Sequence, residues 1–369
     1  MVEWKRLGEV CEVLRGKRLT KSQLNDKGGY PVLHGGSTPM GYYEKFNRKA
    51  NTTVVVNTGN AGSVFYYDKE FWSSDACFSL YPNKEIIDKY LYLYVYGCER
   101  ILKGKIRAGA MPTIDAKAVE DLIIPIPSLS EQTRIVDILD TFTSSIDNLK
   151  EQIAERRKQY EHYRDQLLDL EGKEGVEMKK LEEMCEIKGR IGFRGYTRED
   201  QVAKGEGALT LTATNIVNQR IDYTNNTYIT WDKYYESPEI MVNEGDIIVC
   251  QRGSIGKIAI IKNLKEKATI NPQLLLLKKI RCNNRYLIHY LLSQFFQESL
   301  NRIIGHGTVQ MIAQKDLKEL RIPAIESKEQ SRIVSILDTF EASIANLEAQ
   351  LELREKQYDY YRNKLLTFE

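Results

Sequence analysis

The 369-residue sequence lacks the features by which membrane, secreted and metal-binding proteins are usually recognised. No run of about 18 apolar residues is present, which argues against a transmembrane helix. The segment MVEWKRLGEV has neither the basic start nor the apolar stretch of a signal peptide. The six cysteines form no CxxC pair, and none has a histidine nearby at zinc-ligand spacing. These absences predict a cytoplasmic protein with free thiols and no metal site.

Signatures of catalysis are also missing. The chain has no GxGxxG after a strand, no P-loop and no HExxH. The segment 271–274 (NPQL) resembles the Asn-Pro-Pro-aromatic tetrad of amino-methyltransferases, but it lacks the second proline and the aromatic residue. Pairs of Asp and Glu show no spacing typical of a nuclease. The sequence therefore predicts a non-catalytic chain that carries no cofactor of its own.

The small net charge of +2 hides an alternation along the chain. Residues 1–125 carry 18 Lys and Arg against 14 Asp and Glu, and residues 173–324 carry 23 against 18. Residues 126–172 and 325–369 are acidic, with 6 against 10 and 6 against 9. This pattern weakly favours contact between a polyanion and the two basic parts.

An internal duplication organises the sequence. Residues 121–171 and 319–369 align without a gap at an offset of 198 and share 27 identities in 51 positions. A weaker similarity relates the preceding parts, where Gly59 and Gly62 align with Gly253 and Gly256. We therefore expect a first globular domain (1–128), a long helix (129–172), a second globular domain (173–326) and a C-terminal helix (327–369).

The duplicated segments are typical of long helices that pack on each other. Each begins after a proline-bearing turn, and its apolar residues recur in alternating steps of four and three, the heptad pattern of a left-handed coiled coil. A helix of about forty residues is about 60 Å long. Antiparallel pairing would give a pseudo-twofold axis. The predicted seam residues are Ile135, Leu139, Phe142, Ile146, Leu149, Ile333, Leu337, Phe340, Ile344 and Leu347.

Arginine interrupts this seam in both copies, at Arg156 and Arg354. In one interpretation, each aliphatic stem passes the seam so that the charged end reaches water or a glutamate. In the other, the paired polar positions fix the register of the helices.

The remaining parts are predicted to be mixed and strand-rich, so the fold class is α+β. Short β-prone runs bounded by Gly and Asn predict strands at 53–56, 64–67, 247–250, 258–261 and 274–277. Helices are predicted at 89–98 and 284–304.

Two glycine loops between predicted strands are the strongest candidates for contact with nucleic acid. Glycine permits positive φ and close approach of the backbone, and Asn, Gln and Arg side chains can recognise adenine and guanine edges. Each loop could equally be only a tight turn. The candidate side chains in these loops are Asn57, Asn60, Gln251, Arg252, Ser254 and Lys257.

Weaker candidates are polar turns and basic clusters, many of which are simply solvated on soluble proteins. Residues 302, 306 and 310 align with 104, 108 and 112 of the first copy but differ from them in polarity, so His306 is considered together with Arg302 and Gln310. These weaker candidates are Lys17, Arg18, His34, Gly35, Lys105, Arg107, Arg194, Thr212, Asn215, Arg302 and Gln310.

At full length the sequence resembles the specificity subunit of type I restriction-modification systems. The resemblance is carried by the duplicated helix starts at 124–142 and 322–340, by WKRLGEV at 4–10, by GG and MGY within 35–42, and by NTGNAG at 57–62. It implies two target-recognition domains that read a bipartite, asymmetric double-stranded DNA site across a nonspecific spacer. It also implies assembly with two modification (methyltransferase) subunits and with restriction subunits, to which S-adenosylmethionine and ATP would belong. We expect the helices to hold the domains about one DNA turn apart, roughly 34–36 Å.

Three alternatives remain open on sequence alone. A coiled-coil scaffold with protein-binding domains would explain the heptads, although not the loops rich in Gly, Asn, Gln and Arg. A methyltransferase or nuclease acting alone would need motifs that we do not find. A system that only methylates would keep the family but lack restriction subunits.

Overall fold

The computed structural model describes residues 2–36, 38–107, 109, 111–305 and 310–368, and the chain divides into two units. Unit 1 is Met1–Glu151 with Glu348–Glu369, and unit 2 is Gln152–Leu347. Each long helix is therefore divided between the two units. The four-part division expected from the sequence stays a prediction, because each of the two compact units combines one strand-rich part with a part of both long helices. No helix in the described part of the chain is both long and apolar enough to cross a membrane.

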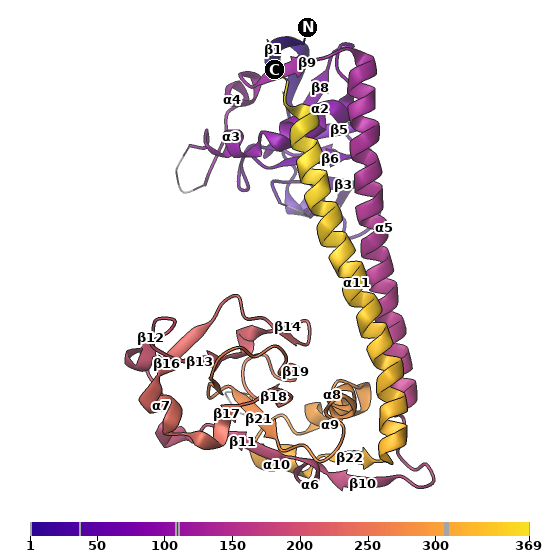
Figure 1. Ribbon diagram of the computed structural model, residues 1–369. Coiled ribbons are helices and arrows are strands. Elements are labelled where there is room, and N and C mark those ends of the chain that lie inside the picture. The colour runs from indigo at the N-terminus through magenta and orange to yellow at the C-terminus, as the bar shows by residue number, and fades with distance from the viewer. Residues whose placement is uncertain (1, 37, 108, 110, 306–309, 369) are drawn as a thin grey trace. The chain divides into compact units, whose positions relative to one another are not determined.

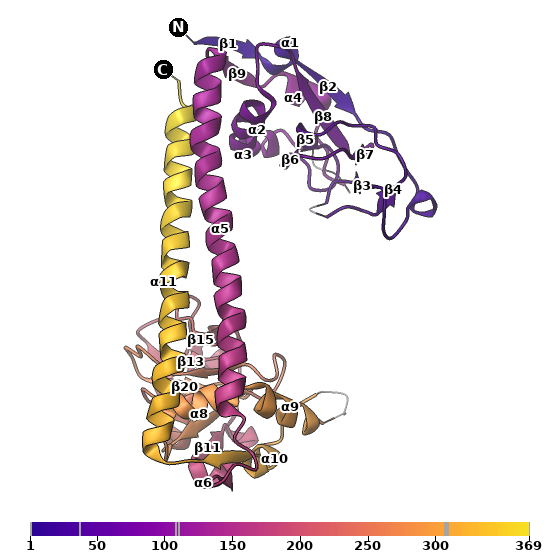
Figure 2. The same ribbon diagram turned by 90° about the vertical axis from the view of Figure 1, so that its right-hand side faces the viewer.

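Unit 1 contains an antiparallel sheet in the order β2-β8-β5-β6 and a smaller sheet in the order β4-β3-β7 (Figures 1 and 2). In the smaller sheet β3 and β7 run parallel. The strand β1 pairs with β9, the strand just before the first long helix. The strands are β1 Glu3–Arg6, β2 Cys11–Arg15, β3 Tyr30–Leu33, β4 Tyr42–Tyr43, β5 Thr52–Val56, β6 Val64–Tyr67, β7 Trp72–Ser73, β8 Cys77–Pro82 and β9 Ile123–Ile126.

Helices cover the core of unit 1. Tyr90, on the helix that follows β8, is fully buried and donates a hydrogen bond to the carbonyl of Pro125 at 3.0 Å. Figure 2 shows the C-terminal end of the second long helix beside the start of the first, where Leu365 and Phe368 pack on the core. The helices are α1 Leu7–Val10, η1 Lys21–Gln23, α2 Asp88–Gly97, α3 Glu99–Lys103, α4 Ala116–Glu120 and α5 Leu129–Leu168.

Unit 2 repeats this plan with additions. Its sheet β11-β21-β18-β19 corresponds to β2-β8-β5-β6, and its second sheet is longer, in the order β12-β16-β13-β20-β17. A separate hairpin pairs β14 with β15. The strands are β10 Glu177–Lys180, β11 Glu186–Gly189, β12 Gln201–Val202, β13 Gly207–Leu211, β14 Ile216–Val217, β15 Arg220–Ile221, β16 Thr227–Thr230, β17 Met241–Val242, β18 Ile247–Cys250, β19 Ile258–Ile260, β20 Ala268–Ile270, β21 Leu274–Lys278 and β22 Arg321–Ala324.

The helices of unit 2 correct one prediction. The segment 284–304 is not one helix, because Ser293 separates α8 from α9. Its buried hydroxyl donates to the carbonyl of Tyr290 at 2.7 Å and accepts from the amide of Phe296, which ends one helix and caps the next. The helices are α6 Leu181–Met184, η2 Gly192–Arg194, η3 Arg198–Asp200, η4 Ala213–Asn215, α7 Trp231–Tyr235, η5 Pro238–Ile240, α8 Asn284–Leu291, α9 Gln294–Arg302, α10 Gln314–Glu319 and α11 Ser327–Leu366.

The other local predictions are confirmed. The predicted strands correspond to β5, β6, β18, β19 and β21, and the helix predicted at 89–98 is α2. The helices α5 and α11 are each 40 residues long and form an antiparallel pair within each unit. The mixed α+β class is therefore correct.

A glutamine near the start of each long helix attaches that helix to its unit. Gln132 is fully buried, accepts from the amide of Ile87 at the start of α2, and donates to the carbonyls of Glu85 and Pro127. Gln330 repeats this arrangement by accepting from Asn283 at the start of α8. The duplicated Glu-Gln motif thus has a structural reason, because the carboxamide satisfies backbone groups that would otherwise be buried without partners.

The seam residues divide into two groups. Ile135 and Leu139 are fully buried in the core of unit 1, and Ile333 and Leu337 are fully buried in the core of unit 2. Farther along the helices the packing is between α5 and α11. The remaining predicted seam positions there are buried or half-buried, namely Phe142, Ile146, Leu149, Phe340, Ile344 and Leu347.

Candidate nucleic-acid interface

The glycine loop of unit 1 connects β5 to β6, and its shape depends on two glycines with positive φ. Gly59 and Gly62 have φ of +88° and +81°, values that favour glycine. A Cβ at Gly62 would lie 3.1 Å from the backbone nitrogen of Lys103. The loop therefore packs closely on the end of α3, and glycine is required there.

Two more of the predicted segments meet this loop. A Cβ at Gly35 would lie 2.4 Å from the carbonyl oxygen of Thr58, so the segment after β3 lies directly against the loop. The amide of Gly59 donates to the carbonyl of Pro112 at 3.2 Å, which brings the chain after α3 to the same place. Residues scattered over about eighty positions in sequence are thus assembled into one cluster of loops.

The side chains exposed on this cluster are polar and basic. His34, Asn60 and Lys105 are exposed, and the Nδ1 atom of His34 lies 2.9 Å from the Ser74 hydroxyl. Arg107 is exposed but forms an ion pair with Asp115. The amide of Lys17 donates to the carbonyl of Ser73, so the exposed Lys17 and Arg18 lie near the same loops.

Asn57 has a different position from the one its sequence context suggests. Its side chain is only 3% exposed; it donates to the carbonyl of Asp75 and accepts from the Thr58 hydroxyl. Both ends of the carboxamide are therefore engaged within unit 1, and Asn57 shapes the loop rather than projecting from it.

Unit 2 assembles an equivalent cluster. Gly253 and Gly256, between β18 and β19, have φ of +77° and +84°. The amide of Ile312 donates to the carbonyl of Gln251 at 3.0 Å, just as the amide of Ile114 donates to the carbonyl of Asn57 at 2.8 Å. The backbone architecture of the loops is thus shared by the two units.

The side chains on this second cluster differ from those on the first. Arg252 is exposed, and its Nη2 atom lies 3.6 Å from the sulfur of Met311. Ser254, Arg302 and Gln310 are exposed, as is Lys257, whose Nζ donates to the carbonyl of Ile216. His306 lies outside the described residues.

The remaining candidates of unit 2 are engaged in internal contacts. Gln251 is half-buried and donates to the carbonyl of Pro272. Arg194 is half-buried and lies 3.6 Å from Glu239. Asn215 is 2% exposed; it accepts from Thr212 and donates to the carbonyl of Asp222. Thr212 and Asn215 therefore stabilise a turn.

The sequence interpretation missed the hairpin of β14 and β15. Its turn residues Asn218 and Gln219 are exposed, with φ of +48° and +62°. An Asn in the two-residue turn between Ile216-Val217 and Arg220-Ile221 was the available signal, but it is weak without Gly at the second position.

Cysteine chemistry is not expected at either cluster. Burial raises the pKa of the Cys250 thiol, which lies at the base of the second loop, and raises the pKa of Cys11 and Cys185 to about 12. These thiols are therefore protonated at neutral pH and poor nucleophiles.

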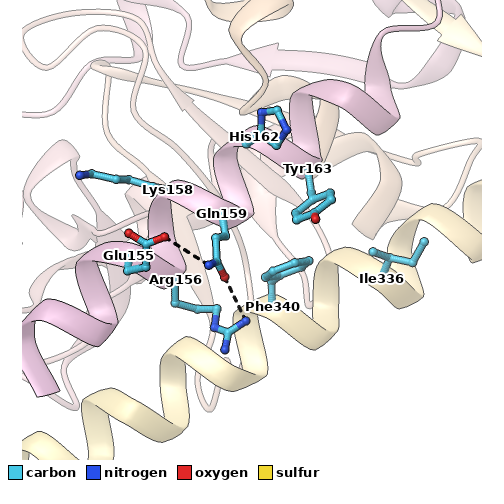
Figure 3. A pocket seen from close by; sticks show the side chains of 8 residues that line it. All are labelled: Glu155, Arg156, Lys158, Gln159, His162, Tyr163, Ile336 and Phe340. Atoms are coloured by element: carbon cyan, nitrogen blue, oxygen red, sulfur yellow. Dashed lines mark hydrogen bonds between the residues drawn. The ribbon is translucent and has the colours of Figure 1, made fainter.

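The helix pair carries a second kind of site. Within unit 2 a pocket of about 590 Å³ lies between α5 and α11, and Tyr163 stacks on Phe340 along one side of it (Figure 3). Arg156 donates to Gln159 at 3.1 Å and lies over the ring of Phe340, with its guanidinium carbon 5.9 Å from the ring centroid. Its equivalent Arg354 lies over Phe142 in unit 1 at 5.6 Å. Each arginine thus crosses the seam to cover an aromatic ring of the other helix.

The chain thus has two similar units, each with a glycine-loop cluster and part of the duplicated helix pair. This arrangement is typical of proteins that recognise a target with two related domains. The chain matches the type I restriction modification DNA specificity domain over residues 1–156 and again over 173–354, and it belongs to that family. It is a specificity subunit, the non-catalytic component of such a system that binds the DNA target.

Relatives support this assignment over nearly their whole length. The sequence is 29% identical to a Haemophilus influenzae protein assigned as a type I restriction enzyme specificity subunit, covering 100% of this chain and 96% of that protein. It is 28% identical to the EcoR124I/EcoR124II specificity subunit of Escherichia coli, covering 100% and 94%.

Solved structures share the fold. The S subunit of a type I restriction-modification system from M. genitalium superposes with a TM-score of 0.63 at 18% identity, covering 100% of this chain and 97% of that one. A chain from a study of the assembly and conformational transition of the type I system superposes with a TM-score of 0.60 at 19% identity, covering 99% and 96%.

Proposed function

We propose that each unit reads one half of a bipartite, asymmetric site on double-stranded DNA through its glycine-loop cluster. The observation that carries this proposal is the shared backbone of the two clusters combined with their different exposed side chains. Where unit 1 presents His34 and Asn60, unit 2 presents Arg252 and Lys257. Equivalent scaffolds with unequal side chains should select different bases, because base identity is read by side-chain donors and acceptors.

The duplicated helices are proposed to bind two copies of one modification (methyltransferase) subunit. The contacts on α5 and α11 recur at the offset of 198 in both units, so each unit offers a similar surface to a partner. One relative in structure comes from work on complex assembly in this class of system. Restriction subunits would join the same complex when the system cleaves DNA.

The protein is proposed to act in the cytoplasm. All six cysteines are free, and five of them are buried, as expected for a chain that folds in a reducing compartment.

Methylation mapping tests the proposal. The chain and its modification subunit are expressed in a host without other DNA methylation, and methylated sites are located by single-molecule sequencing. A motif of two specific parts separated by unspecified bases is expected. A single continuous motif would contradict reading by two units.

A DNA-reading subunit and a protein-binding scaffold differ in how their affinity for DNA depends on salt concentration. If several phosphates are contacted, the affinity of the assembled complex for duplex DNA should fall steeply, with a log-log slope of roughly −0.9 per phosphate. A scaffold that does not touch DNA would show no such binding. A system without restriction subunits would methylate the same motif but never cleave unmodified DNA.

A further inference from the structure

The hairpin of β14 and β15 in unit 2 is not among the elements to which the proposed function assigns a role. It consists of Ile216–Val217 and Arg220–Ile221 joined by the two-residue turn Asn218-Gln219. Both turn residues have positive φ, as a type I′ turn requires. Glycine would adopt this conformation without steric cost, yet both positions carry carboxamide side chains.

The base of the hairpin is held firmly. Asn215 donates to the carbonyls of Asp222 and Asn225, and the amide of Asp222 donates back to the carbonyl of Asn215 at 2.8 Å. Ile216 is 2% exposed and belongs to a core cluster of unit 2. The two turn residues are therefore presented from a rigid support, which favours specific contacts over adaptable ones.

The hairpin lies beside the glycine loop. Lys257 of that loop donates to the carbonyl of Ile216, and β15 packs against β19. A pocket of about 600 Å³ lies between them and is lined by both turn residues, by Ile255, Gly256 and Lys257 of the loop, and by Gln297 of α9. The hairpin and the loop thus border one pocket, whose lining also includes the apolar Val217 and Leu292.

Unit 1 differs at the corresponding place. After β3, which like β13 pairs with a parallel neighbour, the described chain returns as β4 and pairs with β3 itself. In unit 2 the chain between β13 and β16 contains the additional pair of β14 and β15. Among the described residues this extra strand pair is a feature of unit 2, which fits an element that distinguishes the two half-sites.

We infer that this hairpin enters the major groove of the second half-site and that Asn218 and Gln219 read adenine there. A two-stranded ribbon fits the major groove, and Asn or Gln can bond both N6 and N7 of adenine. Lys257 places positive charge beside the hairpin, as contact with phosphate requires. The inference rests on the proposed function and specifies which side chains of unit 2 determine its sequence.

The test replaces both turn residues with glycine, N218G with Q219G, in the full chain expressed with its modification subunit. Glycine preserves the turn and removes both carboxamides. The matched control is N263G, because Asn263 is also exposed with a positive φ of +59° but follows the opposite end of β19. A second variant, Q219E, keeps the shape of the side chain and replaces its amide donor with a carboxylate, which accepts from cytosine.

The expected result is a relaxed motif. The double variant should lose roughly tenfold to a hundredfold of its discrimination at one or two positions of a single half-site, which is the effect of losing bidentate base contacts. The other half-site and the N263G motif should stay as in the wild type. Q219E should shift preference from adenine towards cytosine at the same position.

The outcomes separate the inference from the proposed function. If the wild type methylates a bipartite motif and both turn variants keep it unchanged, the hairpin does not read bases, although two-unit recognition stands. If the variants lose affinity equally for all sequences, the hairpin contacts phosphates and the inference is wrong. A wild type without a bipartite motif would overturn both.

Discussion

Phe142 of α5 stacks on Tyr361 of α11, with ring centroids 5.2 Å apart and an interplanar angle of 28°. Their duplicated counterparts Phe340 and Tyr163 stack in unit 2 at 5.3 Å and 27°. Each helix thus supplies the phenylalanine of one stack and the tyrosine of the other. A duplicated helix that packs antiparallel on its own copy makes every contact twice, so each unit receives the same pair.

The first prediction concerns this stack. Replacing Phe142 with Ala should lower the free energy of unfolding, and a double-mutant cycle with Tyr361→Ala should give a coupling of about 0.5–1.5 kcal/mol. Chemical denaturation measures both. The pair Phe340→Ala and Tyr163→Ala should give a similar coupling, and a coupling near zero in both cycles would show that the stacks contribute nothing beyond burial.

The second prediction concerns Arg252. Its replacement with Ala should relax specificity at one base pair of the second half-site, at a cost of about 1–3 kcal/mol in discrimination. Methylation mapping measures the change. Arg281→Ala is a suitable control, since Arg281 is an exposed arginine before α8 whose guanidinium donates to the carbonyl of Glu183. A uniform loss of affinity over all sequences would identify Arg252 as a phosphate contact.

The third prediction concerns partner docking. Ile336 lines the pocket between the helices in unit 2, and Ile138 is its duplicated counterpart. Replacing both with Asp should weaken assembly with the modification subunit, because a charge would be buried in the contact. Size-exclusion chromatography of the coexpressed subunits measures this.

The control for docking places the same charges on the same helices. Thr141 and Thr339 are exposed and are also related by the duplication. Their double replacement with Asp should leave assembly unchanged. Normal assembly of the isoleucine variant would place the docking surface elsewhere.

The fourth prediction concerns acid stability in unit 2. Burial alone would raise the pKa of Asp338, but hydrogen bonds from His289 and Arg285 outweigh it and hold that pKa well below its usual range. A carboxyl with a lowered pKa stabilises the fold above its unfolded pKa of about 4, and this contribution is lost as the pH falls. Asp338→Asn should therefore destabilise the chain at neutral pH, and the difference from the wild type should shrink on acidification.

Thermal unfolding between neutral and acidic pH measures this effect. Asp140→Asn is the matched control, since Asp140 occupies the duplicated position and forms a longer ion pair, with Lys89 at 3.5 Å. A difference in unfolding temperature between Asp338→Asn and the wild type that does not change with pH would show that the ionised carboxylate is not the source of the stabilisation.

The fifth prediction concerns the spacer of the DNA motif. If the length of the long helices sets the spacing of the half-sites, removing one heptad from α5 and the matching heptad from α11 should change the number of unspecified bases. Methylation mapping reads this number directly. Active variants with an unchanged spacer would refute a role of helix length.

Much of the architecture could be predicted from the sequence because it depends on local patterns. The heptad steps predicted the helices that became α5 and α11, and the β-prone runs predicted β5 and β18, since side-chain periodicity is set by backbone geometry. The stretch predicted to be helical at 284–304 is helical but divided into α8 and α9, because the break at Ser293 depends on a buried capping contact, which leaves little trace in periodicity.

The exposure of the polar side chains was decided only by the tertiary structure. In the sequence Asn57, Asn215 and Asn218 look alike, because each lies in a turn. In the structure the first two are buried with hydrogen-bonded carboxamides, whereas the third is exposed at the tip of a hairpin. The difference arises because neighbouring turns of the folded chain bring hydrogen-bond partners to the two buried carboxamides. The sequence by itself therefore determined the duplication, the elements and the family, whereas long-range packing decided which of its polar residues face outward and can meet DNA.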